Sequence, residues 1–586
     1  MTIPAALMLL LMSGAVDAAP PPVEAPDTTR RRPGPSRDLP PPIQQQNEGA
    51  VRAPPPEAFP TDHIPVPDRW RLIENLGVKE RWYDPYNQNT LKGDRPLKGH
   101  DDLFLVVTGV SDTVVEPRSF PTPVSIQTTT RPGSLDVFGR SKSLLASQTF
   151  IGGVALIKGS TAYKPPVYEV RLTLAANLNH VAVNERRVLH VQPSKGKTRT
   201  DGFLGMQEAF VDYHLRDVSD RYDFDSVRIG IQPFSSDFRG FLFQDNQLGI
   251  RFFGNRDNNR FQYNLAAFWR IEKDTNSGLN DITQSPRDDM LFVANLYRQD
   301  LPVAGLTSQL TAIWNRNREG NDIHVDDNGF PVRPALLGNL RARDYDVVYL
   351  GYNADGRIGR LNLTASVYGA LGKDRNSIFT GKPAKIRAFF AAAEPSIDFD
   401  WTRVRLSALY ASGDGDPYDD SQNGFDAIFE NPQFAGADTS YWVRQTIPFA
   451  GGGRAVSVNG RNGILNSLRS SKEEGQSNFV NPGTILLGIG ADFDLTPTLR
   501  VTGNFNQLWF ADTASLRALR NEGSIPRSIG SDLSVSTILR PKMTQNIVLR
   551  ASAAMLIPGA GFRDLFVASR GDRRLYSLLL NSTLSF

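Results

Sequence analysis

The last twelve residues, LYSLLLNSTLSF (575–586), alternate between apolar and polar side chains and end on an aromatic residue. Tyr576, Leu578, Leu580, Leu584 and Phe586 share one face of a β-strand, because successive side chains of a strand point to opposite sides. A buried final strand of a soluble domain would show a similar pattern. The ending therefore predicts a terminal strand, and the rest of the chain decides what kind of sheet it joins.

The same period of two recurs upstream, in VYEVRLTLAANL (167–178), RFQYNLAAFWRIEK (260–273) and QNIVLRASAAMLI (545–557). In each of these segments one face is apolar and the other carries charged or polar side chains. Between residues 103 and 586 we count about 16 to 18 such segments of roughly 9 to 12 residues, the length that a tilted strand needs to cross a bilayer. Short connections, such as 354–360 and 400–401, alternate with long ones, such as 317–344 and 412–482.

Soluble sandwiches also alternate, so aromatic placement has to separate the two classes. Trp269, Trp314, Trp509, Phe510 and Tyr576 fall near predicted strand ends, as in the aromatic girdles of membrane barrels. The sequence predicts an all-β fold, a transmembrane antiparallel β-barrel of about 16 to 18 strands in a Gram-negative outer membrane. Outer-membrane lipid is then one partner.

Composition excludes several other classes. The chain has 586 residues with a net charge of +3 and no cysteine, so disulfides, thiolate metal sites and a nucleic-acid partner are not expected. No apolar run is long enough for a membrane helix. The histidines His180, His190 and His214 lack metal-type spacing, and no catalytic motif stands in the sequence. We therefore expect neither an enzyme nor a cofactor.

The first hundred residues divide into three parts. Residues 1–18 contain an apolar stretch followed by Val16-Asp17-Ala18, which is typical of a cleaved signal peptide. Residues 19–68 are rich in proline and predict a disordered linker or an extended arm toward a periplasmic or peptidoglycan partner. Residues 69–100 predict a short periplasmic cap or partial plug. The barrel is expected at 101–586.

Inward-facing positions of the predicted strands carry many arginines, which would lower the barrier to anions. Their acidic counterparts are fewer, so anionic solutes are favoured. An equally open alternative is that these groups pair with one another and stiffen the wall. The pore-lining candidates are Arg171, Arg228, Arg251, Arg270, Arg403, Arg405, Arg500, Arg550, Glu169 and Glu272, and further inward acids are Glu208, Asp212 and Asp532.

The stretch LSALYASGDGDPYDDSQNGFDAIFENPQFAG (406–436) resembles the alginate-export porin family. The resemblance implies an 18-stranded barrel with an arginine-rich pore for an acidic polysaccharide. The ending also resembles the terminal strand that the barrel-assembly machinery recognises, with Tyr576, Leu584 and Phe586 as its signal. The matching residues of the first stretch are Ser412, Gly413, Asp414, Asp416, Phe425, Asp426 and Phe429.

Within this stretch, Asp414, Asp416, Asp419 and Asp420 crowd together and form a candidate calcium site, although the spacing is not that of an EF-hand. Two functions from different classes remain open. One is a porin-like channel for small or polymeric anionic solutes. The other is a scaffold without open-channel activity, plugged by its N-terminal region or threaded by a partner. An outer-membrane enzyme ranks last.

Overall fold

A computed structural model describes residues 77, 79–84, 89–119, 121, 140–159, 165–221, 223–333, 341–447, 449, 461–542, 544–566 and 574–586. The expected signal peptide and the proline-rich linker lie outside these residues, as does most of the first part of the expected cap. The barrel belongs to a unit that spans Arg69–Phe586.

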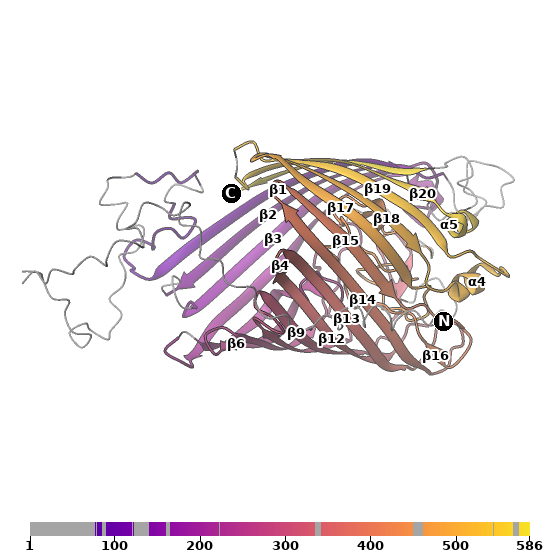
Figure 1. Ribbon diagram of the computed structural model, residues 1–586, viewed down its shortest axis with the longest axis horizontal. Coiled ribbons are helices and arrows are strands. Elements are labelled where there is room, and N and C mark those ends of the chain that lie inside the picture. The colour runs from indigo at the N-terminus through magenta and orange to yellow at the C-terminus, as the bar shows by residue number, and fades with distance from the viewer. Residues whose placement is uncertain are drawn as a thin grey trace, which may run out of the picture. The chain divides into compact units, whose positions relative to one another are not determined.

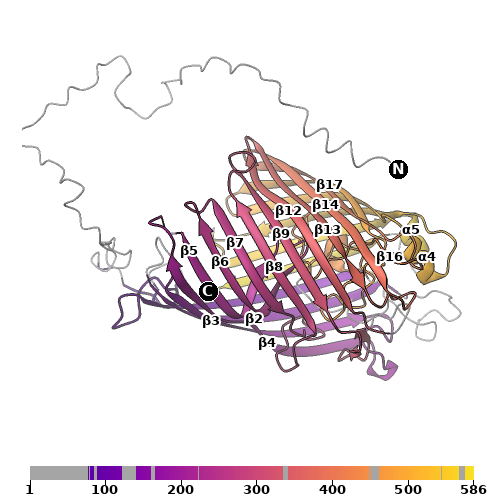
Figure 2. The same cartoon turned by 90° about the horizontal axis from the view of Figure 1, so that it is seen from below.

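In the described part of the chain, eighteen antiparallel strands form one closed barrel (Figures 1 and 2), which confirms the predicted fold class. Consecutive strands pair along the chain, and β21 pairs with β1. The strands are β1 (Leu103–Ser119), β2 (Lys142–Lys158), β3 (Tyr168–Val183), β4 (Thr198–Asp217), β5 (Phe224–Ser235), β6 (Gln244–Arg256), β7 (Phe261–Trp269), β8 (Asp289–Arg298), β9 (Leu306–Asn317), β12 (Tyr345–Ile358), β13 (Leu361–Asp374), β14 (Ala384–Phe399), β15 (Thr402–Ala411), β17 (Thr484–Thr496), β18 (Leu499–Trp509), β19 (Ser528–Leu539), β20 (Ile547–Pro558) and β21 (Leu575–Ser585).

Short helices and strands lie in the connections between the barrel strands. They are the 3₁₀ helix η4 (Pro193–Lys195), the hairpin β10 (His324–Val325) and β11 (Pro331–Arg333), strand β16 (Ser421–Gln422), and the helices α3 (Tyr441–Gln445), α4 (Ala514–Arg520) and α5 (Ala560–Leu565). Strand β16 runs parallel to the start of β14. Among the described residues, no helix is long and apolar enough to cross a membrane.

The two ends of the barrel differ in the length of their connections. Turns at the end that holds the C-terminus are short, such as Asp400-Trp401 between β14 and β15. Connections at the other end are long, and α4, α5 and β16 lie there (Figure 1). The expected turn at 354–360 is wrong in extent, because β12 continues to Ile358 and leaves Gly359-Arg360 as the turn. By this asymmetry the long-loop end is extracellular.

The outer face of the wall is apolar around the barrel. Leu178, Leu204, Leu310, Leu350 and Leu580 are each more than half exposed, although leucine is usually buried in a water-soluble protein. In β21, Leu578, Leu580 and Leu584 point outward as the sequence predicts, while Ser577 and Leu579 point inward. A continuous exposed apolar belt on a closed barrel is the surface that a bilayer covers.

One strand assignment from the sequence is wrong. The alternation in 260–273 predicts that Ile271 continues the outer face of β7, but β7 ends at Trp269. Ile271 is 3% exposed, and its backbone N–H donates to the side-chain oxygen of Gln247 at 2.6 Å. Arg270 and Glu272 therefore belong to a loop. Several other strands, β4 above all, exceed the expected length and extend past the membrane-crossing part.

The seam of the barrel, where β21 meets β1, is paired along only part of β1. β21 pairs with β1 from Val110 to Arg118, so the first residues of β1 have no partner in β21. A segment that precedes the barrel occupies this edge, where Lys92 bridges to Val106 and the backbone N–H of Val107 donates to the carbonyl oxygen of Leu91 at 2.6 Å. The Lys92 ammonium lies 4.7 Å from the ring centre of Phe586. The described part of the expected cap thus lies along an edge of the wall.

Candidate functional site in the barrel lumen

Three extracellular connections fold into the lumen. They are the β5–β6 loop (236–243), the β7–β8 loop (270–288) and the β15–β17 loop (412–483), whose described side chains are mostly buried. The carbonyl oxygen of Ser236 accepts hydrogen bonds from Asn295 at 3.4 Å and Gln309 at 2.6 Å, which both point inward from the wall. Much of the lumen is therefore occupied by the chain itself.

Aromatic side chains of these loops form a core inside the barrel. Phe241 of the β5–β6 loop lies 5.0 Å from Phe390 of β14 and 5.3 Å from Phe434, measured between ring centres. Phe390 stacks on Phe425 of the β15–β17 loop at 5.1 Å. All four rings are buried, with Phe429 beside them. Phe425 and Phe429 belong to the stretch that resembles alginate-export porins, and here they anchor a loop in the lumen.

Helix α3 attaches the β15–β17 loop to the wall. Asp532 points inward from β19 and accepts hydrogen bonds from the backbone N–H groups of Tyr441 and Trp442, both at 3.1 Å, and from the Ser440 hydroxyl. The first N–H groups of a helix lack partners within the helix, so a carboxylate at this point satisfies them. Asp532 therefore fixes the position of the loop.

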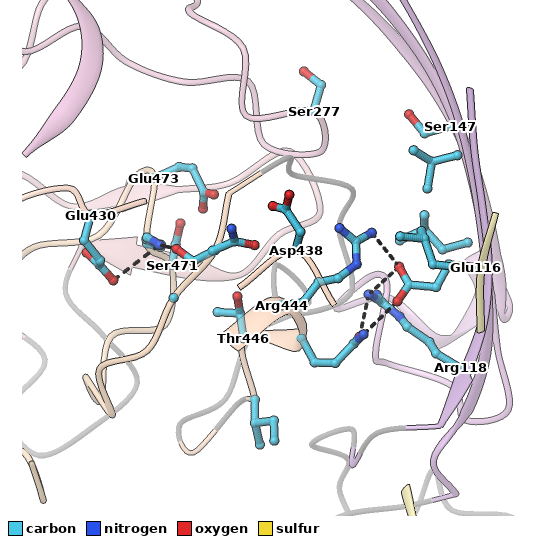
Figure 3. A pocket seen from close by; sticks show the side chains of 18 of the residues that line it. Glu116, Arg118, Ser147, Ser277, Glu430, Asp438, Arg444, Thr446, Ser471 and Glu473 are labelled. Carbon is cyan, nitrogen blue, oxygen red and sulfur yellow. Dashed lines mark hydrogen bonds and ion pairs between the residues drawn. The ribbon is translucent and has the colours of Figure 1, made fainter. Parts of the chain in front are cut away.

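A second attachment lies at the C-terminal end of α3, at Arg444 and Gln445 (Figure 3). Glu116 of β1 accepts from Arg444 at 3.1 Å, from the amide of Gln445 at 2.7 Å and from the Ser577 hydroxyl at 2.5 Å. Arg118 donates to the Gln445 side chain at 3.0 Å. These groups come from β1, β21 and α3, so they hold the loop against the seam of the barrel.

Ion pairs stabilise the interior of the β15–β17 loop. Arg469 contacts Asp426 at 2.9 Å and Glu430 at 3.0 Å, and Lys472 contacts Glu430 at 3.3 Å. Burial alone would raise the pKa of Glu430, but the positive charges of Lys472 and Arg469 outweigh it and lower that pKa to about 2. The loop therefore keeps this carboxylate ionised away from bulk water.

The β7–β8 loop is tied to its neighbours by a similar network. Arg287 contacts Glu319 at 2.8 Å, and Arg333 contacts Glu272 at 2.5 Å and Glu319 at 3.4 Å. Arg333 also donates to the carbonyl oxygen of Glu474 at 2.8 Å, which links the β15–β17 loop to the same group. Burial would raise the pKa of Glu319, but Arg287 and Arg333 lower it to about 2. Glu272 is thus a structural partner of Arg333.

Two cavities lined by the described residues lie between the loops and the wall. The larger has a volume of about 580 Å³ and lies against β1, β2, β20 and β21, and the smaller has about 510 Å³ and lies against β5 and β6. Ser277 and Leu279, at the tip of the β7–β8 loop, line both cavities. This tip therefore stands between them. The charged residues of the larger cavity are Asp112, Glu116, Glu430, Asp438, Glu473, Arg118, Arg444, Arg469, Lys472 and Arg550.

The predicted arginines are engaged rather than free. Arg550 lines the larger cavity and Arg251 the smaller, while Arg270 is buried. The pairs are Arg171 with Glu169 (2.7 Å) and Glu208 (3.8 Å), Arg228 with Asp212 (2.7 Å), Arg251 with the amide of Asn264 (2.7 Å), Arg270 with Asp289 (2.8 Å), Arg403 with Asp398 (2.5 Å), Arg405 with Asp492 (2.6 Å), Arg500 with Asp494 (2.6 Å) and Arg550 with Asp438 (3.1 Å). Arg403 and Arg500 lie beside turns at the periplasmic end.

One pair of these arginines stands apart. Arg228 of β5 and Arg251 of β6 lie directly opposite each other in the antiparallel register, so both side chains point into the lumen. Arg228 pairs with Asp212, whereas Arg251 donates to the neutral side-chain oxygen of Asn264. The two guanidinium groups also lie over aromatic rings, 4.3 Å from Phe210 for Arg228. Among the described residues, no carboxylate lies within ion-pair distance of Arg251.

The four aspartates of the candidate calcium site are not gathered around one point. Asp414 is buried and accepts from the backbone N–H of Asn423 at 2.9 Å, whereas Asp416 and Asp419 are exposed and accept from backbone N–H groups of their own turns. Among the described residues, no group of three or more acidic or histidine side chains is placed to hold a metal ion. Burial, together with Asp419 and Asp416, raises the pKa of Asp414 to about 7.

Sequence reasoning missed the residues that hold the lumen loops. Glu116, Arg118 and Arg444 carry no spacing signal, because their partners lie hundreds of positions away in the chain. The inward position of Asp532 was predicted, but its role as a helix cap was not. The acidic and basic residues between 461 and 474 had one available signal, a concentration of charge inside a long loop that is also rich in Ser and Asn.

No model of a known protein family matches the chain, and no curated protein matches it either. Several solved outer-membrane channels are similar in structure. Pseudomonas aeruginosa OccK9 (OpdG) has 11% identity and a TM-score of 0.46, with 82% of this chain and 98% of that chain covered. Acinetobacter baumannii OccAB3 has 10% identity and a TM-score of 0.44, with 82% and 99% covered. Such low similarity adds nothing about solutes.

The barrel itself defines the class of protein. A closed antiparallel barrel, with an exposed apolar belt, short turns at one end and long loops at the other, is an outer-membrane β-barrel. The chain is therefore a Gram-negative outer-membrane protein. Its lumen holds folded loops and two polar cavities, and the function has to be argued from these.

Proposed function

We propose that this protein is a porin-like channel that passes small anionic solutes across the outer membrane. The observation that carries the proposal is the opposed pair Arg228 and Arg251 on the inner wall, with Arg251 lining the smaller cavity. Arg461 lines the same cavity, and Asp245 is its acidic counterpart. Positive charge at a narrow point of a pore lowers the barrier to anions.

Charge pairing explains why the anion preference is assigned to this cavity. In the larger cavity acidic and basic residues are evenly matched. In the smaller cavity, Asp245 already contacts Lys273 at 2.8 Å and also binds Arg461. Asp212 likewise is held by Arg228. Of the cations that line the two cavities, Arg251 is therefore the one without a carboxylate within ion-pair distance, and a passing anion is its best partner.

The filled lumen supports small solutes over a polymer. Two cavities of about 510 and 580 Å³, divided by the tip of the β7–β8 loop, have the size of sites that hold small molecules. The stretch that resembles alginate-export porins contributes Phe425, Asp426 and Phe429 to the packed loop core. Transport of an acidic polysaccharide would require this core to move.

Ion selectivity in planar lipid bilayers tests the proposal. We expect the full-length protein to conduct with a preference for chloride over potassium, and Arg251→Ser to lower that preference. Arg403→Ser is the matched control, because Arg403 lies by a turn and pairs with Asp398. Cation selectivity of the unaltered channel, or equal selectivity of the two variants, would contradict anion transport.

A plugged scaffold is the second candidate, and the double attachment of α3 by Asp532 and Glu116 favours it. A loop held this firmly would close the lumen permanently. In that case the unaltered protein would show no steady conductance, while Asp532→Asn would produce channel events. Steady conductance of the unaltered protein would decide for the channel.

For assembly we propose recognition of Tyr576, Leu584 and Phe586 by the barrel-assembly machinery.

A further inference from the structure

The outer wall carries a cluster of positive charge at its extracellular rim. Lys373 of β13 lies directly opposite Lys385 of β14 in the antiparallel register, and Arg387 follows two residues later on the same face of β14. All three side chains are exposed, whereas Ile386 and Ala388 between and beside them are buried on the inner face. The three cations therefore point away from the lumen, toward the surroundings of the barrel.

The cluster is not neutralised by the protein. Like charges directly opposite each other destabilise an antiparallel pair, so an arrangement of this kind normally has a counterion. Asp346 faces Lys373 in the register with β12, but its oxygens are held by Arg318 at 2.8 Å and Arg375 at 2.9 Å. No carboxylate of the described residues lies within ion-pair distance of the three cations.

Directly below the cluster the wall turns apolar. Leu371 is opposite Arg387 and is 53% exposed, and Phe389, the next outward residue of β14, is 45% exposed and lies 6.3 Å from Tyr410 between ring centres. Aromatic and aliphatic side chains at this level mark the boundary between acyl chains and headgroups. The three cations therefore stand at the level of the lipid headgroups of the outer leaflet.

A depression in the apolar belt lies beside the cluster, on strands β6 to β12. It has a volume of about 470 Å³ and an almost wholly apolar lining. Trp314 and Val348 form its margin toward the cluster, and two residues further up the same strands stand Arg316 and Asp346. Its outward-facing lining includes Ile250, Leu265, Phe292, Ala312, Trp314 and Val348.

We propose that Lys373, Lys385 and Arg387 bind the phosphate of a phosphorylated glycolipid in the outer leaflet, with an acyl chain of that lipid in the adjacent depression. Ammonium and guanidinium groups are the side chains that bind phosphate, and clusters of them next to an apolar surface select anionic lipids. The lipid supplies the counterion that the opposed lysines lack. A free phosphate ion would satisfy the charges but not the depression.

Native mass spectrometry of the full-length protein in detergent tests this site. The probes are diphosphoryl lipid A and the same lipid without its phosphates. The triple variant Lys373→Gln, Lys385→Gln, Arg387→Gln is compared with Arg260→Gln, Arg360→Gln, Lys542→Gln, which removes the same charge at the periplasmic turns. We expect the first variant to bind diphosphoryl lipid A roughly 100-fold more weakly and the second to bind it normally.

The dephosphorylated lipid should bind both variants and the unaltered protein equally weakly. Full competition by inorganic phosphate at concentrations that leave lipid binding by the control variant unchanged would show a free-anion site and overturn the proposal. Equal lipid affinity of the two triple variants would overturn it as well. A change of oligomeric state in the first variant, with unchanged lipid affinity, would assign the surface to a second copy of the chain. Conductance is expected to be the same in all three proteins, so the result is independent of the channel function.

Discussion

The outer and inner faces of the same strands follow different rules. On β3, Leu172 and Leu174 face the lipid and need no partner, whereas Arg171 and Thr173, which alternate with them, face the lumen and bind Glu169 and Glu208. The outer face is specified residue by residue through alternation. The inner face is specified by pairs between distant parts of the chain. The stability of the outer face should therefore depend on the polarity of its residues alone, whereas the stability of the lumen should depend on particular pairs of residues.

The largest effect on stability is expected from a change of pH at the base of the β15–β17 loop, where Asp414 is buried. Its raised pKa, about 7, means that the folded protein holds a proton that the unfolded chain releases near pH 4. This contribution to stability is complete below pH 4 and is lost as the pH rises through 7, by up to about 4 kcal/mol. Thermal unfolding measured from pH 4 to 8 should show the decline.

Asp414→Asn should flatten this pH dependence, and Asp416→Asn, at an exposed carboxylate two residues away, should leave it in place. A decline of the same size in the Asp414→Asn variant would assign the titration to another group.

Substitutions at two adjacent positions of β3 test which face of the wall meets the lipid and which meets the lumen. Leu174→Lys places a charge in the apolar belt and should lower the free energy of unfolding by about 2–4 kcal/mol. Thr173→Lys places the same charge in the lumen, next to Glu208, which accepts from Thr173 at 2.8 Å. The second change should cost less than about 1 kcal/mol, because a new ion pair offsets the lost hydrogen bond. Urea unfolding in lipid vesicles measures both, and equal costs would refute the assignment of the two faces.

The next largest effect on the free energy of unfolding is expected where Asp532 attaches α3 to the wall. Asp532→Asn replaces an acceptor by an amide whose N–H groups face the helix N–H groups, which should cost about 1–3 kcal/mol. The loop should loosen, so conductance and current noise should rise. Asp398→Asn, at the Arg403 turn, is the matched change outside the lumen. Unchanged noise in Asp532→Asn would mean that the Glu116 contacts hold the loop alone.

The smallest effect is expected for exposed ion pairs near the turns. Arg500 and Asp494 are 2.6 Å apart, but both side chains are more than 40% exposed. Water screens such pairs, so Arg500→Ser should change the free energy of unfolding by less than about 1 kcal/mol. Thermal unfolding at low and high salt checks this, and a large salt-dependent loss would show that the turn charges act as a network.

The sequence predicts the wall well because alternation is a local signal. The faces of β3 and β20 and the Asp400-Trp401 turn follow from neighbouring residues alone. It fails at Ile271, whose apolar side chain continues the pattern although Gln247 binds its backbone. It fails again in the lumen, since Asp532 and Ser440 are 92 positions apart. Only the folded chain shows which inward charges meet.

The uneven seam sets the order in which the barrel can form. β1 meets β21 only after nearly the whole chain has been made, since Val110 pairs with Ser585. Contacts this distant in sequence form slowly, and until then β1 presents an open edge to which other chains can add. The segment around Leu91 and Lys92 can cover the first residues of that edge early, because it is synthesised just before β1. Deleting it should lengthen the lifetime of the open state and increase aggregation before insertion, while the finished barrel keeps most of its seam.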